Sequence, residues 1–244
     1  MRHRFAFPPA LFLTLALSFT AASSWADAFP PIQEFSDAAQ VIAPSNAVLA
    51  TCSVGETRPP AISSGGGFVV PGLTFYTLLN PADCPACNTG LLVLRTANFR
   101  ARTLSGVCTF TVEVTILGSQ AGPACIVPDP SHVICGPVNL DITSPGTAAF
   151  TASVPLPANC CISTTAFLRV RLLTTGGCAA GQPSWGTASG GCISCRSFME
   201  GPGLPFTDAC GFLNANPVQW VDADCCDPTP NLRGTWGRVK MLYR

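Results

Sequence analysis

Apolar and polar residues alternate along much of the chain with a period of two, which is typical of β-strands. The clearest alternation covers residues 107–117, where Glu113 and three threonines form the polar face. The apolar face of this segment comprises Cys108, Phe110, Val112, Val114 and Ile116. Residues 165–173 repeat the pattern, with Arg169 and Arg171 on the polar face. Strict alternation predicts strands with one face in a core and the other in water.

Shorter strand patterns follow along the rest of the chain. They cover residues 47–54, 67–70, 74–79, 91–97, 132–142, 147–154 and 218–222. Turn sequences such as Pro71-Gly72 and Pro145-Gly146 separate them. Many short strands joined by turns predict an all-β fold, an antiparallel β-sandwich in jelly-roll or Greek-key style. We expect residues 45–232 to form this domain, after a polar lead-in at 27–44 whose composition is compatible with disorder.

Residues 174–208 lack this alternation and are rich in glycine, serine, proline and cysteine. They predict a long loop over the surface, pinned by Cys178, Cys192 and Cys195. Long loops with no secondary structure of their own are usually functional or disordered. Because the cysteines favour order, this loop is the first place to look for a binding site.

The C-terminal tail, residues 233–244, has a different pattern. After Thr235, which can cap a helix, apolar residues recur at near-helical spacing at Trp236, Val239, Leu242 and Tyr243. The tail therefore predicts a short helix or strand packed on the sandwich. A C-terminal sorting signal is the alternative.

The first 26 residues have the three parts of a secretory signal peptide. Arg2 and Arg4 form a basic start, residues 11–19 are apolar, and residues 21–24 are small. Cleavage is expected after Ala26, and the apolar run is too short to span a bilayer. The mature chain is thus predicted to be secreted, periplasmic or at the cell surface, and not to span a membrane.

Cysteine content agrees with export, because disulfides persist in oxidising compartments. All fourteen cysteines follow the signal segment, and we expect all of them in disulfides: Cys52, Cys84, Cys87, Cys108, Cys125, Cys135, Cys160, Cys161, Cys178, Cys192, Cys195, Cys210, Cys225 and Cys226. At about 2–4 kcal/mol each, these bridges are expected to replace a thick apolar core. Their connectivity stays open. In the adjacent pairs Cys160-Cys161 and Cys225-Cys226, each member is expected to reach a different partner.

Two cysteine spacings suggest other chemistry. Cys84-Pro85-Ala86-Cys87 resembles the motif of thiol oxidoreductases, and Cys192 and Cys195 repeat the spacing. A redox motif needs a helix N-terminus after a strand, whereas turn residues flank Cys84 and Cys87. The two pairs are also compatible with a four-cysteine zinc site, but ten other cysteines compete for them. Disulfides are therefore the favoured interpretation.

Charge and motif content argue against nucleic-acid binding and against an enzyme. With 13 basic and 13 acidic residues and no long basic stretch, the chain lacks the means to neutralise many phosphates. His132 is the one histidine beyond the signal segment, and neither GxSxG nor HExxH occurs. Glu113 and Glu200 are the obvious glutamates for a glycosidase pair, but Glu113 is placed on a wet strand face. We predict no catalytic residue.

Two features point to ligand binding. Asp222, Asp224 and Asp227 lie close together in WVDADCCD and suggest a calcium site, although they lack the pattern of an EF-hand loop. No other cofactor is expected. Three aspartates near a strand end are more often simply solvated. Trp185 and Trp220 are candidate platforms for sugar stacking, with ordinary packing as the alternative for Trp185.

The C-terminal sequence TWGRVKMLYR and the paired cysteines in PANCC and DADCC carry a resemblance. They resemble a group of uncharacterised secreted bacterial β-sandwich proteins with a signal peptide, paired cysteines and a TWGxxKxLYR-like ending. The resemblance covers short motifs only. It implies export and a β-sandwich, and it implies no activity.

The sequence thus predicts a secreted, disulfide-rich β-sandwich with a structural, adhesive or binding role at the cell surface or outside the cell. The alternative is a carbohydrate-binding module, assisted by calcium, that uses Trp185 or Trp220 together with Asp222 and Asp224. An extracellular glycan or a surface protein is the expected class of partner.

Overall fold

A computed structural model describes residues 40–42, 52–61, 70–87, 90–104 and 106–226. The expected signal peptide, most of the lead-in, Asp227 and the tail at 233–244 lie outside the described residues. Within the described part of the chain, no helix has the length and apolar character needed to cross a membrane.

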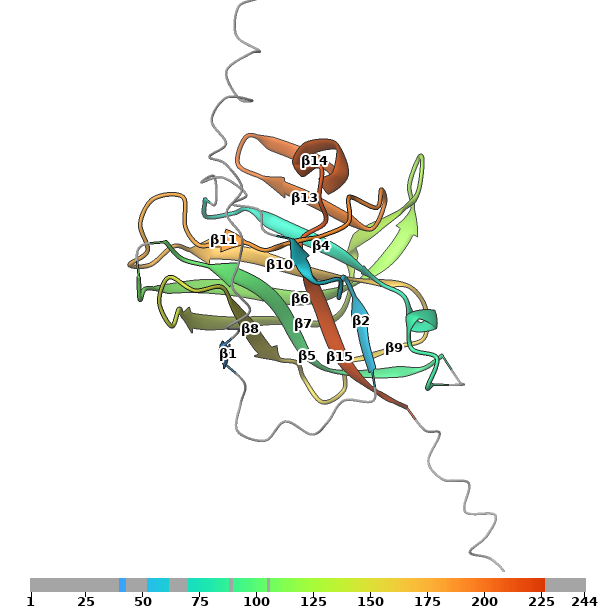
Figure 1. The fold of residues 1–244 in the computed structure, drawn as a ribbon. Coiled ribbons are helices and arrows are strands. Elements are labelled where there is room, and N and C mark those ends of the chain that lie inside the picture. Colours follow the sequence, from blue (N-terminus) through green and yellow to red (C-terminus); the bar gives the residue numbers. More distant parts are fainter. Residues whose placement is uncertain (1–39, 43–51, 62–69, 88–89, 105, 227–244) are drawn as a thin grey trace, which may run out of the picture.

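Two β-sheets form the body of the protein (Figure 1). The seven-stranded sheet has the order β1 (Gln40–Ile42), β8 (Phe150–Pro155), β5 (Leu92–Arg102), β15 (Gln219–Cys225) and β2 (Cys52–Gly55), and β9 (Cys161–Ile162) and β11 (Ser184–Trp185) also pair with β5. The six-stranded sheet has the order β14 (Leu204–Asp208), β13 (Ser197–Gly201), β4 (Thr74–Leu79), β10 (Ala166–Thr174), β6 (Thr109–Ala121) and β7 (Ile126–Thr143).

Three small elements complete the described structure. β3 (Pro60–Ala61) and β12 (Thr187–Ala188) form a two-stranded sheet. A 3-10 turn, η2, covers Pro81–Asp83, and one α-helix, α1, covers Ala209–Leu213. The predicted C-terminal helix lies outside the described residues, and no sequence pattern predicts a helix where α1 lies. Its first turn begins at Asp208, whose side chain accepts a hydrogen bond from the amide of Cys210 and so caps the helix.

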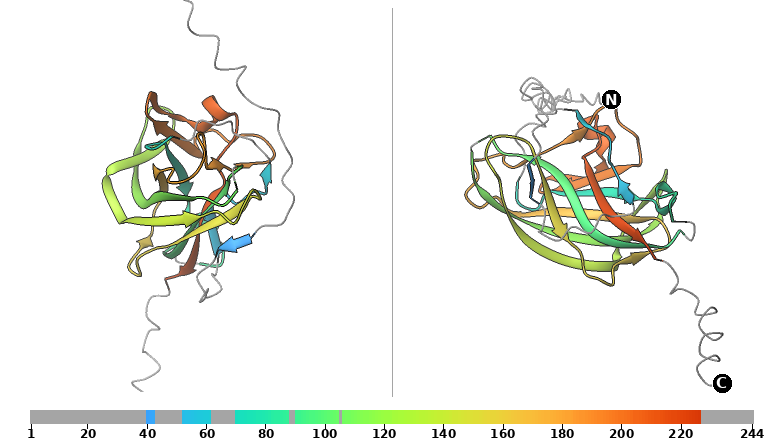
Figure 2. Two further views of the ribbon diagram at one scale, coloured as in Figure 1. Left: turned by 90° about the vertical axis from the view of Figure 1, so that its left-hand side faces the viewer. Right: turned by 60° about the horizontal axis from the view of Figure 1, so that its bottom comes forward.

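The two sheets pack face to face as a β-sandwich, as Figure 2 shows from two sides. All pairings except the parallel β1–β8 contact are antiparallel. Neighbouring strands are often distant in sequence, as for β4 with β10 and β5 with β15. This confirms the predicted fold class, since crossovers between layers are the mark of Greek-key sandwiches.

The apolar faces predicted for β6 and β10 meet in the core. All of the residues expected on these faces are buried: Cys108, Phe110, Val112, Val114, Ile116, Ala166, Leu168, Val170 and Leu172. Thirty buried residues form one continuous cluster between the sheets. The expectation that disulfides replace a thick apolar core is therefore wrong. Strands whose sequence pattern is weaker, such as β4, β5, β8 and β15, also bury apolar side chains in this core.

The predicted loop at 174–208 is also wrong in part, because the strands β11, β12, β13 and β14 lie within it. β13 and β14 form a hairpin through a two-residue turn at Pro202 and Gly203, where Gly203 has φ +75°. A positive φ favours glycine, so Gly203 suits this turn. The part of this segment before β13 is held by Arg58, whose side chain donates a hydrogen bond to the carbonyl of Gly191 at 2.9 Å.

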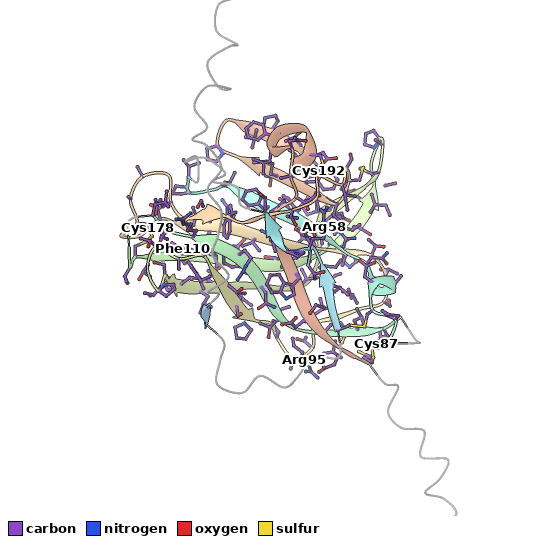
Figure 3. The ribbon with its side chains drawn as sticks, in the orientation of Figure 1. Arg58, Cys87, Arg95, Phe110, Cys178 and Cys192 are labelled. Carbon is purple, nitrogen blue, oxygen red and sulfur yellow. A yellow bond between two sulfur atoms is a disulfide. The ribbon has the colours of Figure 1, made fainter. Side chains whose placement is uncertain are left out.

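Six disulfides join twelve of the cysteines: Cys52–Cys84, Cys87–Cys225, Cys108–Cys178, Cys125–Cys195, Cys135–Cys160 and Cys192–Cys210. They are spread over the sandwich, and Cys87 and Cys178 lie at opposite ends of it in Figure 3. The pairing confirms disulfides for these twelve residues. Cys161 and Cys226 are free thiols, which corrects the expectation that all fourteen are bonded. Their sulfur atoms are 3.7 Å apart, too far for a bond of about 2.05 Å.

Candidate functional site: a pocket on the six-stranded sheet

The outer face of the six-stranded sheet gathers polar and aromatic side chains from three neighbouring strands. In the pairing of β10 with β4, Arg169 lies opposite Tyr76 and Arg171 lies opposite Thr74. In the pairing of β13 with β4, Glu200 also lies opposite Thr74. Because residues paired across strands point to the same side of a sheet, these side chains share one surface.

The β13–β14 hairpin gives this surface a wall. Phe206 on β14 is 42% exposed, and its ring stacks on Phe198 with the ring centroids 5.1 Å apart. The ring of Phe206 also meets the edge of Tyr76, with the centroids 5.7 Å apart. The result is a pocket of about 460 Å³ lined by Gly72, Thr74, Tyr76, Arg169, Arg171, Glu200, Gly201, Pro202, Leu204, Pro205 and Phe206. Pockets of 300–1,000 Å³ are typical for small ligands.

Arg169 forms the floor of the pocket and is held from the β6 side. Its Nη2 donates to Glu113 Oε1 at 2.7 Å and to Thr115 Oγ1 at 2.9 Å. This ion pair fixes the guanidinium group and neutralises Glu113. The Nε of Arg169 is buried without a hydrogen-bond partner among the described residues. A buried donor of this kind costs free energy, and its burial also keeps it out of reach of a ligand.

Arg171 is the second guanidinium group of the pocket and differs from Arg169 in its surroundings. Its side chain is exposed, and no carboxylate among the described residues lies within 4.0 Å of it. An exposed arginine at the rim keeps five donors in a planar fork, which matches the geometry of a carboxylate or phosphate. At Arg171 the rim of the pocket therefore presents a positive charge to a ligand, while Glu200 adds a negative charge to the lining.

Glu200 on β13 and Tyr76 on β4 line the pocket on the side of the hairpin. The hydroxyl of Tyr76 donates a hydrogen bond to Glu200 Oε1, which orients the carboxylate. Burial, followed by this hydrogen bond, raises the pKa of Tyr76 well above its usual value. Tyr76 is therefore a donor throughout the physiological range, and Oε2 of Glu200, a residue that lines the pocket, is left as an acceptor.

The raised pKa of Tyr76 predicts a spectroscopic result in the Tyr243→Phe variant, in which Tyr76 is the only tyrosine. Absorbance at 295 nm should show no tyrosinate in the native protein at pH 10, whereas the unfolded chain should ionise near the ordinary pKa of about 10. The native state then retains a proton that the unfolded chain loses, so the free energy of unfolding should fall as pH rises above about 10. A native transition at or below pH 10 would contradict this arrangement.

Trp185 does not form a sugar platform, which corrects one of the two tryptophan predictions. It is 5% exposed and packs between the sheets, with ring centroids 4.6 Å from Phe99 and 5.6 Å from Phe75. The β11–β5 pairing turns this side chain inward, because Trp185 lies opposite the buried Ala101. Its packing is the alternative that the sequence left open.

Trp220, Asp222 and Asp224 lie on the seven-stranded sheet, on the outer face of β15. Asp222 accepts hydrogen bonds from Ser53 at 2.6 Å, from Asn98 at 2.8 Å and from the indole N–H of Trp220 at 3.1 Å. Asp224 pairs with Arg95 at 2.7 Å. These carboxylates are already satisfied by donors, and Arg95 opposes a cation, so their surroundings do not favour calcium. Asp227 lies outside the described residues.

The two cysteine motifs serve disulfides. Cys84 and Cys87 bond to different partners, and so do Cys192 and Cys195. Sulfur atoms of Cys52, Cys84 and Cys87 lie within 4.8 Å of one another, but all three belong to disulfides and carry no thiolate for a metal. The redox and zinc interpretations of these motifs are therefore wrong.

The remaining candidate residues for catalysis are not brought together. His132 is exposed on β7, and the hydroxyl of Ser131 donates to Asp129 instead of to the histidine. Glu113 and Glu200 share the outer face of the six-stranded sheet, but two strands separate β6 from β13. At about 4.8 Å per strand, their backbones are about 14 Å apart, beyond the 5–10 Å of glycosidase carboxylates.

Comparison of the chain with models of known protein families, with curated proteins and with solved structures finds no match. The resemblance of the two chain ends to secreted bacterial sandwich proteins therefore stays a prediction.

Proposed function

We propose that the protein is an exported binding protein, not an enzyme, and that its ligand is a saccharide bearing a carboxylate, held in the pocket under the β13–β14 hairpin. The observation that carries this proposal is the exposed guanidinium group of Arg171, which has no carboxylate partner among the described residues and lies at an aromatic-walled pocket. Export is supported by the signal-peptide pattern of residues 1–26 and by the six disulfides.

The chemistry of the pocket suits a ligand with three kinds of surface. Arg171 can pair with a carboxylate through its planar fork of donors. Glu200 can accept from a hydroxyl, because only Oε1 is occupied by Tyr76 among the described residues. The exposed ring of Phe206 can lie against the apolar face of a sugar ring. A uronic acid combines these surfaces, and a pocket of about 460 Å³ is of suitable size for one or two sugar units.

A second candidate uses the opposite sheet. Trp220 is partly exposed beside Asp222 and Asn98, which favours a neutral glycan lying along the outer face of β15. This is the carbohydrate-binding alternative predicted from the sequence, without the contribution of Trp185.

The proposal predicts that Arg171→Ala weakens binding of an oligogalacturonate by about 10- to 100-fold, the usual cost of losing a hydrogen bond to a charged group. Isothermal titration calorimetry with oligogalacturonate, and with a neutral oligosaccharide of the same length, measures this loss. Arg95→Ala is the matched control, because it removes the same charge from an exposed site on the other sheet.

The outcomes separate the candidate functions. Weaker binding in Arg171→Ala but not in Arg95→Ala supports the pocket. Equal binding by the wild type and Arg171→Ala contradicts it. Loss of binding in Asp222→Ala or in EDTA, with Arg171→Ala unaffected, moves the function to the β15 face. No binding to either oligosaccharide, together with retention at the cell surface that depends on residues 235–244, favours a structural or adhesive role.

A further inference from the structure

Two thiols remain after six disulfides have formed, and they face each other. The S–H of Cys226 donates to the sulfur of Cys161 across 3.7 Å, although 65 positions separate the two residues in sequence. Since the other twelve cysteines are bonded among themselves, each of these two thiols has only the other as a native partner. We call them the Cys161/Cys226 thiol pair.

Strand pairing brings the Cys161/Cys226 thiol pair together from both sides of β5. On one side, Cys161 on β9 lies opposite Val93. On the other side, Cys225 at the end of β15 lies opposite Leu92, and the amide of the next residue, Cys226, donates to the carbonyl of Leu91 at 2.9 Å. The two thiols thus approach each other at the same end of the seven-stranded sheet.

The sequence neighbours of both thiols are fixed by bonds to other parts of the sandwich. Cys160 is fully buried and bonded to Cys135, and Cys225 is bonded to Cys87. These disulfides hold the backbone on either side of the thiol pair. To form a bond, the two sulfur atoms need to approach by only about 1.6 Å, a movement within reach of side-chain rotation and a small backbone shift.

Exposure distinguishes Cys161 from the other thirteen cysteines of the chain. Cys161 is the only one of the fourteen cysteines whose side chain is exposed, and Cys226 is half-buried. Thiol–disulfide exchange requires access of an external sulfur along the axis of the bond that forms and breaks. In four of the six bridges at least one cysteine is buried, which hinders the approach of an external thiol.

We propose that Cys161 and Cys226 form a reversible seventh disulfide that exchanges with thiols and disulfides outside the protein, whereas the other six bridges are structural. The chemical class of its redox partner is a small-molecule disulfide such as oxidised glutathione. When closed, the bond ties β9 to the end of β15 across β5, directly before residues 227–244.

The reaction proceeds in two exchanges. Cys161, in its thiolate form, attacks one sulfur of glutathione disulfide, whose S–S bond breaks, and the first glutathione leaves as a thiolate. Cys226 then gives its proton to solvent and attacks the Cys161 sulfur, which releases the second glutathione. Two protein thiols are oxidised to a disulfide and one glutathione disulfide is reduced to two thiols.

The two thiols have different roles in this reaction. Burial, followed by the hydrogen bond with Cys161, raises the pKa of Cys226 to about 11. At neutral pH Cys226 is therefore almost entirely protonated, and a thiol attacks a disulfide only as its thiolate. Because Cys161 is also the exposed member, we assign the first attack to Cys161 and the closing step to Cys226.

Differential alkylation tests the proposal. The folded full-length protein is equilibrated in buffers with different ratios of reduced to oxidised glutathione, blocked with iodoacetamide, and mapped by mass spectrometry without reduction. At reducing ratios Cys161 and Cys226 should each carry one alkyl group, and at oxidising ratios they should be joined by a disulfide. The other six bridges should stay intact over the same range.

Two variants make the result specific. Cys161→Ser combined with Cys226→Ser should abolish the response to glutathione and leave the near-ultraviolet circular dichroism spectrum unchanged. Cys226→Ser alone should accumulate a mixed disulfide between Cys161 and glutathione, because the closing thiol is absent.

Three results would overturn the proposal. The first is a Cys161–Cys226 disulfide that stays closed at every ratio of reduced to oxidised glutathione that leaves the other six bridges intact. The second is a pair of thiols that stays open in the most oxidising buffer. The third is earlier opening of another bridge, such as Cys125–Cys195. None of these depends on whether the pocket at Arg171 binds a saccharide.

Discussion

Replacing both Cys87 and Cys225 with alanine is expected to lower the free energy of unfolding by about 4–5 kcal/mol. This bridge joins residues 138 positions apart, so it removes more freedom from the unfolded chain than any other in the protein. It also ties the segment after η2 to the last strand of the seven-stranded sheet. Guanidinium chloride denaturation without reductant measures the loss.

Two double variants serve as controls for this prediction. Removing Cys192 and Cys210, which are 18 positions apart, should cost about 3 kcal/mol. Removing the unbonded Cys161 and Cys226 in protein kept reduced at these two thiols should cost little, because no covalent loop is lost. An equal loss in all three variants would show that local packing, and not loop closure, dominates the contribution of these bridges.

Trp185→Ala is expected to lower the free energy of unfolding by about 3–5 kcal/mol, as is usual when a large aromatic side chain is removed from a core. Trp185 fills the space between the sheets against Phe75 and Phe99. Its indole N–H has no hydrogen-bond partner among the described residues, so it contributes as an apolar ring. Trp185→Phe should therefore retain a large part of the stability. Thermal and chemical denaturation of both variants check this.

Trp220→Ala is the matched comparison and should cost only about 1 kcal/mol, the usual contribution of one hydrogen bond. Trp220 is half-buried on an outer face, where its indole N–H donates to Asp222. If Trp220→Ala destabilised the protein as much as Trp185→Ala, the assignment of Trp185 to the core and Trp220 to the surface would be contradicted.

The regular strands could be predicted because their pattern is local. β6 and β10 alternate strictly, so their core residues follow from a period of two, and the predicted segment at 74–79 coincides with β4. The adjacent cysteines could also be interpreted from local geometry. Cys160 and Cys161 take different directions, as an extended chain requires, one into a buried disulfide and the other to the surface.

The pocket could not be predicted, because distant segments build it. Arg169 and Arg171 were placed on the outer face of their strand, but nothing local indicates that β13 lies two strands away from β10 and brings Glu200 to the same face. The turn at Pro202 and Gly203, between short apolar runs, was the available signal for the β13–β14 hairpin.

The surroundings of Trp185 and of the two aspartates on β15 also could not be predicted from the local sequence. Trp185 stands among glycine, serine and proline, a composition typical of exposed loops, yet two residues of backbone pairing with β5 turn it into the core. Asp222 and Asp224 lie on one side of β15, as strand alternation requires, but their donors Ser53, Asn98 and Arg95 come from other strands. Whether a carboxylate is free for a cation depends on such neighbours and not on its spacing.

The disulfide connectivity has a consequence for how the protein must be made. Only Cys52–Cys84 and Cys135–Cys160 join cysteines that follow one another along the chain, while the other four bridges pass over intervening cysteines. A ribosome delivers Cys87 long before Cys225, and β15, which is inserted between β5 and β2, is the last of the described strands to emerge. Oxidation in order of emergence would therefore trap wrong partners, so correct maturation demands either delayed oxidation or an isomerase that reshuffles early bonds.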